Sequence, residues 1–199
     1  SDICTGAYNW LDHEIAAVEA ALQTWSNVAN IEFVRVEDNN PNATFGLYSV
    51  DCDQIGGSLG MCGLPAPYYP AGIGYLAWDW DGWQYGLQQG GGGFATIIHE
   101  LGHGLGLAHP HDNGGGSPVY PGVTPGDYED TGDFELNQGV WTTMSYNDGL
   151  IANGFNAYDS YGLQATPMAF DVAAIQYLYG ADLTFRTEDN LYILPTSNT

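Results

Sequence analysis

Apolar side chains recur every three or four positions in three segments of the chain, and this spacing predicts three helices. The first covers residues 11–29, with Asp12 as its expected cap. The second covers residues 94–107, and the third covers residues 170–179 and stops at Gly180. The buried stripe of the first helix is expected to comprise Ile15, Val18, Leu22 and Trp25.

Alternating and β-branched stretches between these helices predict strands. They cover residues 31–36, 43–50 and 74–79, and a weaker pattern covers residues 58–64. Glycine, proline and aspartate dominate residues 112–139, which we therefore expect to form a long loop.

The length of 199 residues suits one globular domain with a sizeable core, and an apolar content of 44% argues against wholesale disorder. No apolar run is long enough to cross a bilayer, so we expect no membrane span. The first residues carry no signal-peptide pattern. A signal was removed, or export uses another route, or the sequence begins inside a longer precursor.

The charge is strongly acidic, because 24 acidic residues against two basic ones give a formal net charge of −22. Nucleic acids and anionic membranes attract positively charged surfaces, so neither is an expected partner. The simplest interpretation is a soluble acidic surface, and a specific basic partner is the alternative.

Three cysteines stand at positions 4, 52 and 62. Cys52 and Cys62 bracket a glycine-rich loop and could form a disulfide, which would indicate an oxidising compartment. Cys4 is then the odd cysteine. It is free, or pairs outside this chain, or binds the metal as a thiolate that keeps the protein latent.

The densest chemical pattern is the segment HELGHGLGLAH at residues 99–109. Side chains four residues apart lie on one face of a helix, so His99 and His103 can bind a common ion. Gly106 permits a left-handed turn that ends the helix. The returning chain then brings His109 to the same ion as a third ligand.

Three imidazole ligands favour a catalytic zinc ion, because they leave a coordination position for water. Glu100 lies one residue further along the helix, so it does not bind the metal but can act as a general base. Two histidines four residues apart are by themselves more often structural. Here five fixed positions agree with the zinc-protease pattern, which favours catalysis.

This pattern calls for a methionine turn downstream, and Met144 in the sequence Thr-Thr-Met-Ser-Tyr fits it as an apolar floor beneath the metal. Tyr146 could bring its phenol to the metal or to the substrate oxyanion, or could be a core residue. Asp171 could orient the methionine turn, or could be a favourable charge at a helix N-terminus. We expect His13 on a helix surface and His111 exposed near the cleft, neither of them a ligand.

The chain resembles the serralysin group of metzincins, the secreted bacterial zinc proteases. The resemblance is carried by residues 21–28, 43–46 and 170–181, the zinc segment and the Met-Ser-Tyr turn. It implies an α+β, metzincin-type zincin fold, with a twisted, mostly parallel sheet over an active-site helix, a loop-rich lower subdomain and a C-terminal helix. It also implies that Tyr146 is a fifth, displaceable zinc ligand that swings to stabilise the transition state.

The same resemblance implies how substrate and domains are arranged. Protein or peptide substrate would lie in a cleft as an added strand at the sheet edge, which is residues 58–64 by position. A disulfide between Cys52 and Cys62 would stiffen that rim. The catalytic domain would cover residues 1–180, divided near residue 106. Residues 181–199 would begin a linker to a calcium-binding β-roll.

The sequence departs from the family in three features. Residues 1–10 offer no strand before the first helix, cysteines are present, and no glycine–aspartate repeat of a β-roll follows. Calcium therefore has no clear motif in this chain. Residues 79–82 only faintly echo a calcium loop, and we interpret them as a turn.

The combined prediction is a secreted, extracellular and monomeric zinc endopeptidase, with calcium-binding repeats expected only in a longer protein. Glu100 would take a proton from the attacking water and pass it to the leaving amine, while zinc and Tyr146 stabilise the oxyanion. Two rivals remain: a catalytically silent adhesion or binding module, and a zinc-stabilised structural domain. A silent module is expected to lose Glu100 or a ligand, and all are present here.

Overall fold

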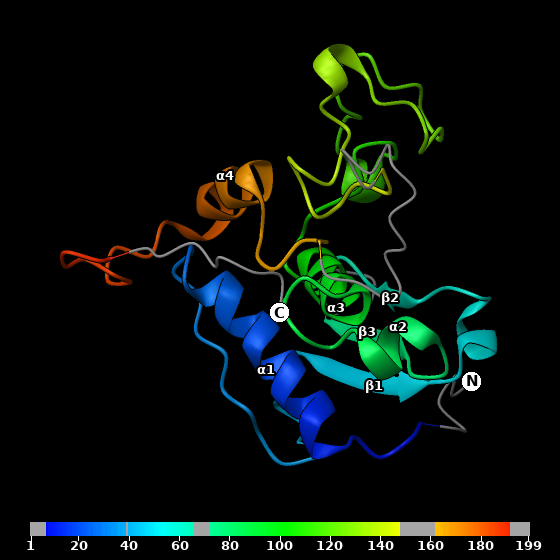
Figure 1. Ribbon diagram of the computed structural model, residues 1–199, viewed down its shortest axis with the longest axis vertical. Helices are drawn as coiled ribbons and strands as arrows, with labels where there is room; N and C mark the ends of the chain where they lie inside the picture. The colour runs from blue at the N-terminus through cyan, green and yellow to red at the C-terminus, as the bar shows by residue number, and fades with distance from the viewer. Residues whose placement is uncertain (1–6, 39, 66–71, 148–161, 192–199) are drawn as a thin grey trace.

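The computed structural model describes residues 7–38, 40–65, 72–147 and 162–191. Within them, helices α1 (Asp12–Ser26) and α3 (Gly92–Gly104) lie beside a small sheet (Figure 1). Helix α4 (Ala169–Tyr179) lies beyond α3, away from strand β1, in both ribbon views. None of the helices in the described part of the chain is long and apolar enough to cross a membrane.

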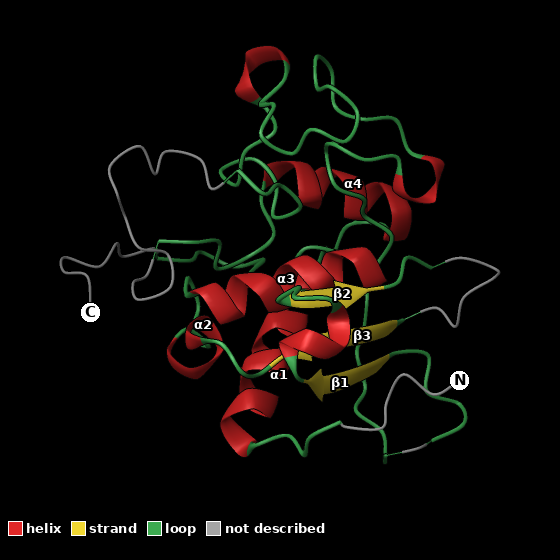
Figure 2. Ribbon diagram, turned by 90° about the vertical axis from the view of Figure 1, so that its right-hand side faces the viewer, coloured by secondary structure: helices red, strands yellow, loops and turns green. Residues whose placement is uncertain are grey.

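The sheet has three strands in the order β1-β3-β2, and it is mixed rather than mostly parallel (Figure 2). Strands β1 (Gly46–Val50) and β3 (Ile73–Ala77) pair in parallel, with Tyr48 opposite Tyr75. Strand β2 (Gly60–Cys62) pairs antiparallel with β3 and forms the sheet edge beside α3. The weak strand pattern at residues 58–64 is therefore confirmed, and an edge strand borders the helix that carries the histidines.

The core lies between the sheet, α1 and α3. Trp25 of α1, Leu76 of β3 and Leu101 of α3 are fully buried in one cluster, which Met144 and Ile175 extend toward α4. The short helix α2 (Asp81–Tyr85) adds its buried Trp83 to the same cluster. Because α3 is covered on several sides, its polar residues Glu100 and His103 are buried.

The residue that caps helix α1 is not the expected one. Leu11 occupies the cap position, and its backbone N–H donates to Glu14 Oε2 at 2.8 Å, whereas Asp12 is the first helical residue. Of the expected buried stripe, Val18 and Trp25 are buried, while Ile15 and Leu22 are half-buried. The buried face is centred instead on Ala17, Val18, Ala21 and Trp25, which lets α1 approach α3 closely.

The strand expected at residues 31–36 is wrong. This segment belongs to no strand, although Ile31 and Phe33 do pack against the core. Val34, on the other face, is 72% exposed. The alternation of apolar residues thus indicates that one face of the segment is buried. It does not show whether a neighbouring strand pairs with the segment.

The disulfide expected between Cys52 and Cys62 is also wrong, because both are free thiols. Cys62 pairs with Gly74 in the sheet, whereas the backbone N–H of Cys52 donates to Asp79, five residues further along. At 3.3 Å per residue, Gly74 and Asp79 are separated by about 16 Å. Their partners Cys62 and Cys52 are therefore too far apart, because a disulfide requires Cα atoms within about 7 Å. Cys4 lies outside the described residues.

Two further expectations concern short segments. Residues 112–139 are a long loop, as expected, with only two single-turn helices, η2 (Gly114–Gly116) and η3 (Asp133–Glu135). The expected turn at residues 79–82 is only partly right, because α2 begins at Asp81. A single-turn helix η1 (Cys52–Ile55) precedes β2.

Candidate metal centre

Helix α3 ends in a geometry that turns the chain back toward the histidines. The Leu107 N–H donates to the Gly102 carbonyl and the Gly106 N–H donates to the His103 carbonyl, both at 2.9 Å. These two bonds define a Schellman motif, which needs a left-handed residue after the cap. Gly106 supplies it with a φ of +108°, so the expected role of this glycine agrees with the structure.

The three expected ligands converge. The Nε2 atoms of His99, His103 and His109 lie 2.9–3.1 Å from one another. Nitrogen ligands at 2.0–2.1 Å on a tetrahedral zinc ion lie about 3.3 Å apart, so this spacing fits one zinc ion closely.

The outer ring nitrogens explain why these three Nε2 atoms are free to bind a metal. Each Nδ1 faces an acceptor: the Thr143 carbonyl at 2.7 Å for His99, the Leu107 carbonyl at 2.8 Å for His103, and Asp112 Oδ2 at 2.5 Å for His109. Nδ1 therefore carries the proton, and three Nε2 lone pairs face one another. Such an arrangement is repulsive without a cation, and it is the usual outer shell of a zinc-binding histidine.

The electrostatics of the imidazoles also suit a metal. Burial, with a smaller effect of His103 and His109, lowers the pKa of His99 to about 3. Burial and the neighbouring His109 lower the pKa of His103 to about 4. Both rings are therefore neutral near pH 7, which is the form that binds zinc.

The methionine turn lies under the histidines and is held by Asp171. This buried carboxylate accepts hydrogen bonds from Thr142 Oγ1, from the Thr143 N–H and from the Met168 N–H at 2.6–2.8 Å. Asp171 thus orients the turn and also caps α4, so both interpretations of this residue hold. Met144 is buried against Gly102, where an added Cβ would come within 2.6 Å of its sulfur.

Glu100 lies beside the triad without joining it. It is 6% exposed, and its Oε2 atom has no hydrogen-bond partner among the described residues. Burial raises its pKa to about 8, against a smaller opposing effect of a hydrogen bond from the Cys62 backbone. A buried carboxylate with one uncommitted oxygen, next to a metal position, is the arrangement of a general base.

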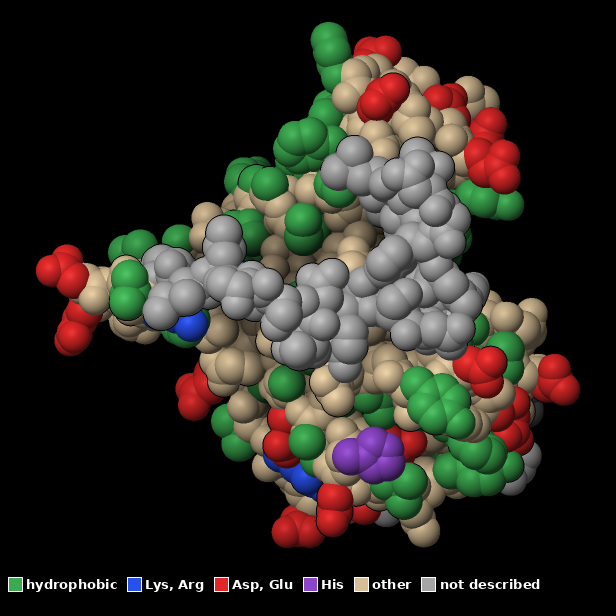
Figure 3. Space-filling model, viewed as in Figure 1, with side chains coloured by type: hydrophobic (Ala, Val, Ile, Leu, Met, Phe, Trp, Pro, Cys, Tyr) green, Lys and Arg blue, Asp and Glu red, His purple; other side chains and the backbone are tan. Residues whose placement is uncertain are grey.

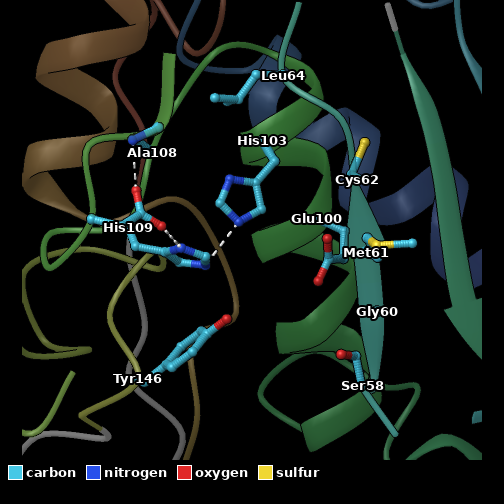
Figure 4. A pocket seen from close by; sticks show the side chains of 12 residues that line it. Ser58, Gly60, Met61, Cys62, Leu64, Glu100, His103, Ala108, His109 and Tyr146 are labelled. Carbon is cyan, nitrogen blue, oxygen red and sulfur yellow. Dashed lines mark hydrogen bonds and ion pairs between the residues drawn. The ribbon is translucent and has the colours of Figure 1, made fainter. Parts of the chain in front are cut away.

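A cleft of about 280 Å³ joins these groups (Figure 4). One wall is β2, with Gly60, Met61 and Cys62; the helix α3 contributes Glu100 and His103 behind it. The opposite wall carries His109 and Tyr146, whose phenol oxygen is directed into the cleft. Tyr146 is 53% exposed, and its ring lies 4.7 Å from that of His109, so it is not the core residue that sequence alone allowed.

The expectation that His111 is exposed is wrong. Its side chain is 7% exposed, and its ring is stacked on His109 with centroids 4.9 Å apart and planes 14° apart. His109, His111 and Asp112 form a second group of possible metal ligands. The two rings are stacked, however, so their in-plane lone pairs lie in separate parallel planes and do not point at one ion. His13, by contrast, is exposed as expected.

Several residues of the site were not predicted from the sequence. Gly60 lets β2 approach Glu100, because a Cβ on Gly60 would lie 2.5 Å from Glu100 Cγ. Gly102 makes room for Met144. Asp112 orients His109, and its hydrogen bonds from His109 and the Gly114 N–H outweigh the effect of burial and lower its pKa. Its position three residues after His109 was the only available signal.

Residues 9–138 match the peptidase family described as matrixin. The chain belongs to the matrixin peptidase family. The match begins before α1 and includes α3 with the whole histidine segment. The resemblance stated from the motifs is thereby confirmed, together with the α+β metzincin fold and the zinc metallopeptidase class.

The curated relatives of this family member are serralysins and a related metallopeptidase. It is 32% identical to a serralysin of Photorhabdus laumondii over 180 residues, and 35% identical to a serralysin of Proteus mirabilis over 200 residues. It is 34% identical to metallopeptidase AprA of Pseudomonas marginalis over 193 residues. These alignments cover 89%, 93% and 89% of this chain, but only 35%, 38% and 36% of the relatives.

The family uses a catalytic zinc ion, and the residues of this matrixin fit that ion on their own geometry. In the part of the chain that the structure describes, no comparable group of side chains is present for calcium. Among the described residues, groups of three or more metal-binding side chains occur only around His109. In residues 79–82, which weakly resemble a calcium loop, Asp79 accepts a hydrogen bond from the Cys52 N–H.

Proposed function

We propose that this matrixin domain is an endopeptidase whose zinc ion is bound by His99, His103 and His109. The observation that carries the proposal is the convergence of three proton-free Nε2 atoms within 3.1 Å, beside the uncommitted carboxylate oxygen of Glu100. Zinc in such a site supplies a Lewis acid that polarises the scissile carbonyl and makes water acidic. The chain supplies the proton transfers and the positioning.

Glu100 is the general base in this proposal. Its Oε2 accepts a proton from the attacking water and delivers it to the nitrogen of the leaving amine. Burial raises the pKa of the carboxyl group, which strengthens Glu100 as the base that accepts the first proton. No covalent acyl-enzyme is required.

Tyr146 would assist at the developing oxyanion. Its phenol is directed into the cleft between His109 and β2, from the wall opposite Glu100 (Figure 4). A neutral phenol donor at this place can stabilise negative charge on the carbonyl oxygen. The resemblance to serralysins adds that Tyr146 can also bind the metal and swing away from it.

Substrate would lie extended along β2. This edge strand borders the cleft, and apart from the Cys62 N–H, which donates to Glu100, its outer backbone groups can pair with a peptide strand. At one end of the cleft, Leu64 reaches the opposite rim, where an added Cβ on Gly114 would lie 3.2 Å from its Cδ1 atom. The substrate side chain at that end is therefore expected to be small.

The surroundings of the domain are part of the same proposal. The chain spans just over a third of the length of the relatives it matches, which supports a place within a longer protein. The division at residue 180 and the linker beyond it remain predictions. Secretion is supported by the resemblance alone, and the acidic surface visible in Figure 3 is compatible with it.

A casein assay with and without a chelator tests this function. Zinc-dependent cleavage that Glu100→Ala abolishes, while the variant keeps its zinc, is the expected result. A silent binding module would bind zinc and cleave nothing. A structural zinc domain would unfold on chelation and would show no cleavage beforehand.

A further inference from the structure

The Tyr146 ring is held mainly by other aromatic rings. The backbone of its turn is fixed, because Ser145 Oγ donates to Asn137 and accepts the Asn147 N–H. The ring itself is half exposed and lies within 6.0 Å of four other rings, centroid to centroid: His99, His109, His111 and Tyr128. Two of these, His99 and His109, belong to the zinc triad, and the other two do not.

His111 is the better anchored of the two rings outside the triad. It is buried, stacked on His109, and its carbonyl accepts the Gly126 N–H at 2.7 Å. Tyr128 is half exposed and contacts His111 from the side, with centroids 6.2 Å apart. Tyr146 lies 5.0 Å from His111 at an angle of 53°, so the two rings are in contact.

Neither metal binding nor hydrogen bonding explains a histidine at this position. Its ring is parallel to that of His109, which prevents the two from sharing an ion. Its Nδ1 is buried and has no hydrogen-bond partner among the described residues. A buried polar atom without a partner is unfavourable, so stability alone does not explain why a histidine occupies this position.

We propose that His111 is a positioning residue for Tyr146. Its ring, stacked on His109, packs against the Tyr146 ring and keeps the phenol directed toward the metal position. The inference rests on the proposed role of Tyr146 at the oxyanion. A flat ring in contact with the Tyr146 ring restricts its motion, and the stack on His109 fixes the His111 ring relative to the metal position.

A double-mutant cycle tests this role. Aromatic ring contacts of this kind contribute enough to predict that His111→Ala lowers kcat about 2- to 10-fold with little change in KM. In a Tyr146→Phe background the same substitution should have no further effect, because no phenol remains to be positioned. His111→Phe, which keeps a flat ring, should restore most of kcat, and His13→Ala serves as the exposed control.

A second readout does not depend on turnover. The visible absorption of the cobalt-substituted protein reports the groups around the metal, and we expect Tyr146→Phe and His111→Ala to change it alike. Each variant is first checked for one equivalent of zinc and for the wild-type circular dichroism spectrum. If His111→Ala does not fold, the kcat and the cobalt spectrum of His111→Phe still test the positioning role.

The outcomes separate the two proposals. If Tyr146→Phe alters kcat and the cobalt spectrum but the His111 variants do not, the positioning role is refuted and the role of Tyr146 stands. Equal losses from His111→Ala in the wild-type and Tyr146→Phe backgrounds would also refute it, since His111 would then act independently of the phenol. If Tyr146→Phe changes neither quantity, the role of Tyr146 fails and the inference fails with it.

Discussion

Gly60 of β2 lies directly against Glu100 of α3, so closely that a Cβ on Gly60 would come within 2.5 Å of Glu100 Cγ and 2.7 Å of its Oε1. The edge strand therefore holds the carboxylate in place by its backbone. Gly60→Ala must displace Glu100, and a displacement of about 1 Å in a catalytic group can cost about 10²-fold in rate.

We therefore expect Gly60→Ala to retain one zinc ion and to lose about 10²-fold in kcat, measured with a fluorogenic peptide. Gly63→Ala is the matched control, because its added Cβ would meet only the Ile73 carbonyl, at 4.0 Å. Equal activities of the two variants would show that the contact does not position Glu100.

Glu100 should also make the metal-free protein less stable as the pH rises. Burial raises its folded-state pKa to about 8, whereas a glutamate in the unfolded chain has its ordinary pKa of 4.5. Between these values the folded state binds more protons than the unfolded state. The free energy of unfolding therefore falls with rising pH, by at most about 1.4 kcal/mol per pH unit.

Glu100→Gln removes this titration. Urea unfolding of the zinc-free proteins should show the variant more stable than wild type at pH 8, with the difference shrinking toward pH 4.5. A difference that is constant across this range would mean that Glu100 ionises normally in the fold.

Asp171 should couple the methionine turn to metal affinity. It is 2% exposed and accepts three hydrogen bonds, one of them from the N–H of Thr143, whose carbonyl faces His99 Nδ1. Asp171→Asn replaces an acceptor by a donor in a buried place. We expect the free energy of unfolding to fall by about 2 kcal/mol or more and zinc affinity to fall about 10-fold or more.

Chelator competition and urea unfolding measure these two effects. Asp53→Asn, at an exposed position, is the control and should change neither quantity appreciably. If Asp171→Asn loses stability but binds zinc as tightly as wild type, the turn does not orient His99.

Leu64 should limit the substrate side chain at one end of the cleft. Its Cδ1 atom lies near the opposite rim, 3.2 Å from where a Cβ on Gly114 would be, so Leu64→Ala would widen that end. Profiling with a peptide library should then show larger side chains accepted at one substrate position, with the other positions unchanged. An identical profile for both proteins would place the specificity elsewhere.

The residues that the sequence predicted well are those whose roles depend on local spacing. His99 and His103 share a helix face, Gly106 ends that helix, and His109 follows within a few residues. Met144 was found by its motif, although its burial beneath the metal site depends on Gly102 of α3. Local spacing in the sequence was therefore enough to predict that the three histidines lie close together.

Most of the errors and omissions concern contacts between distant segments, whereas the cap of α1 at Leu11 and the contact of Asp112 with His109 are local. Ile31 and Phe33 have the alternation of a strand, but pairing depends on which chain lies beside them. The burial of His111 depends on its contacts with Tyr128 and Tyr146, far along the chain. Gly60 matters only because Glu100 packs against it. None of these partners can be read from the spacing around the residue itself.

Titration of the metal-free protein with zinc, followed by cleavage of casein, tests the central claim most directly. We predict that activity rises linearly to one equivalent of zinc per chain and then remains constant. Absence of cleavage at any zinc concentration, or a requirement for more than one equivalent, would contradict the assignment of His99, His103 and His109 as the ligands of a single catalytic ion.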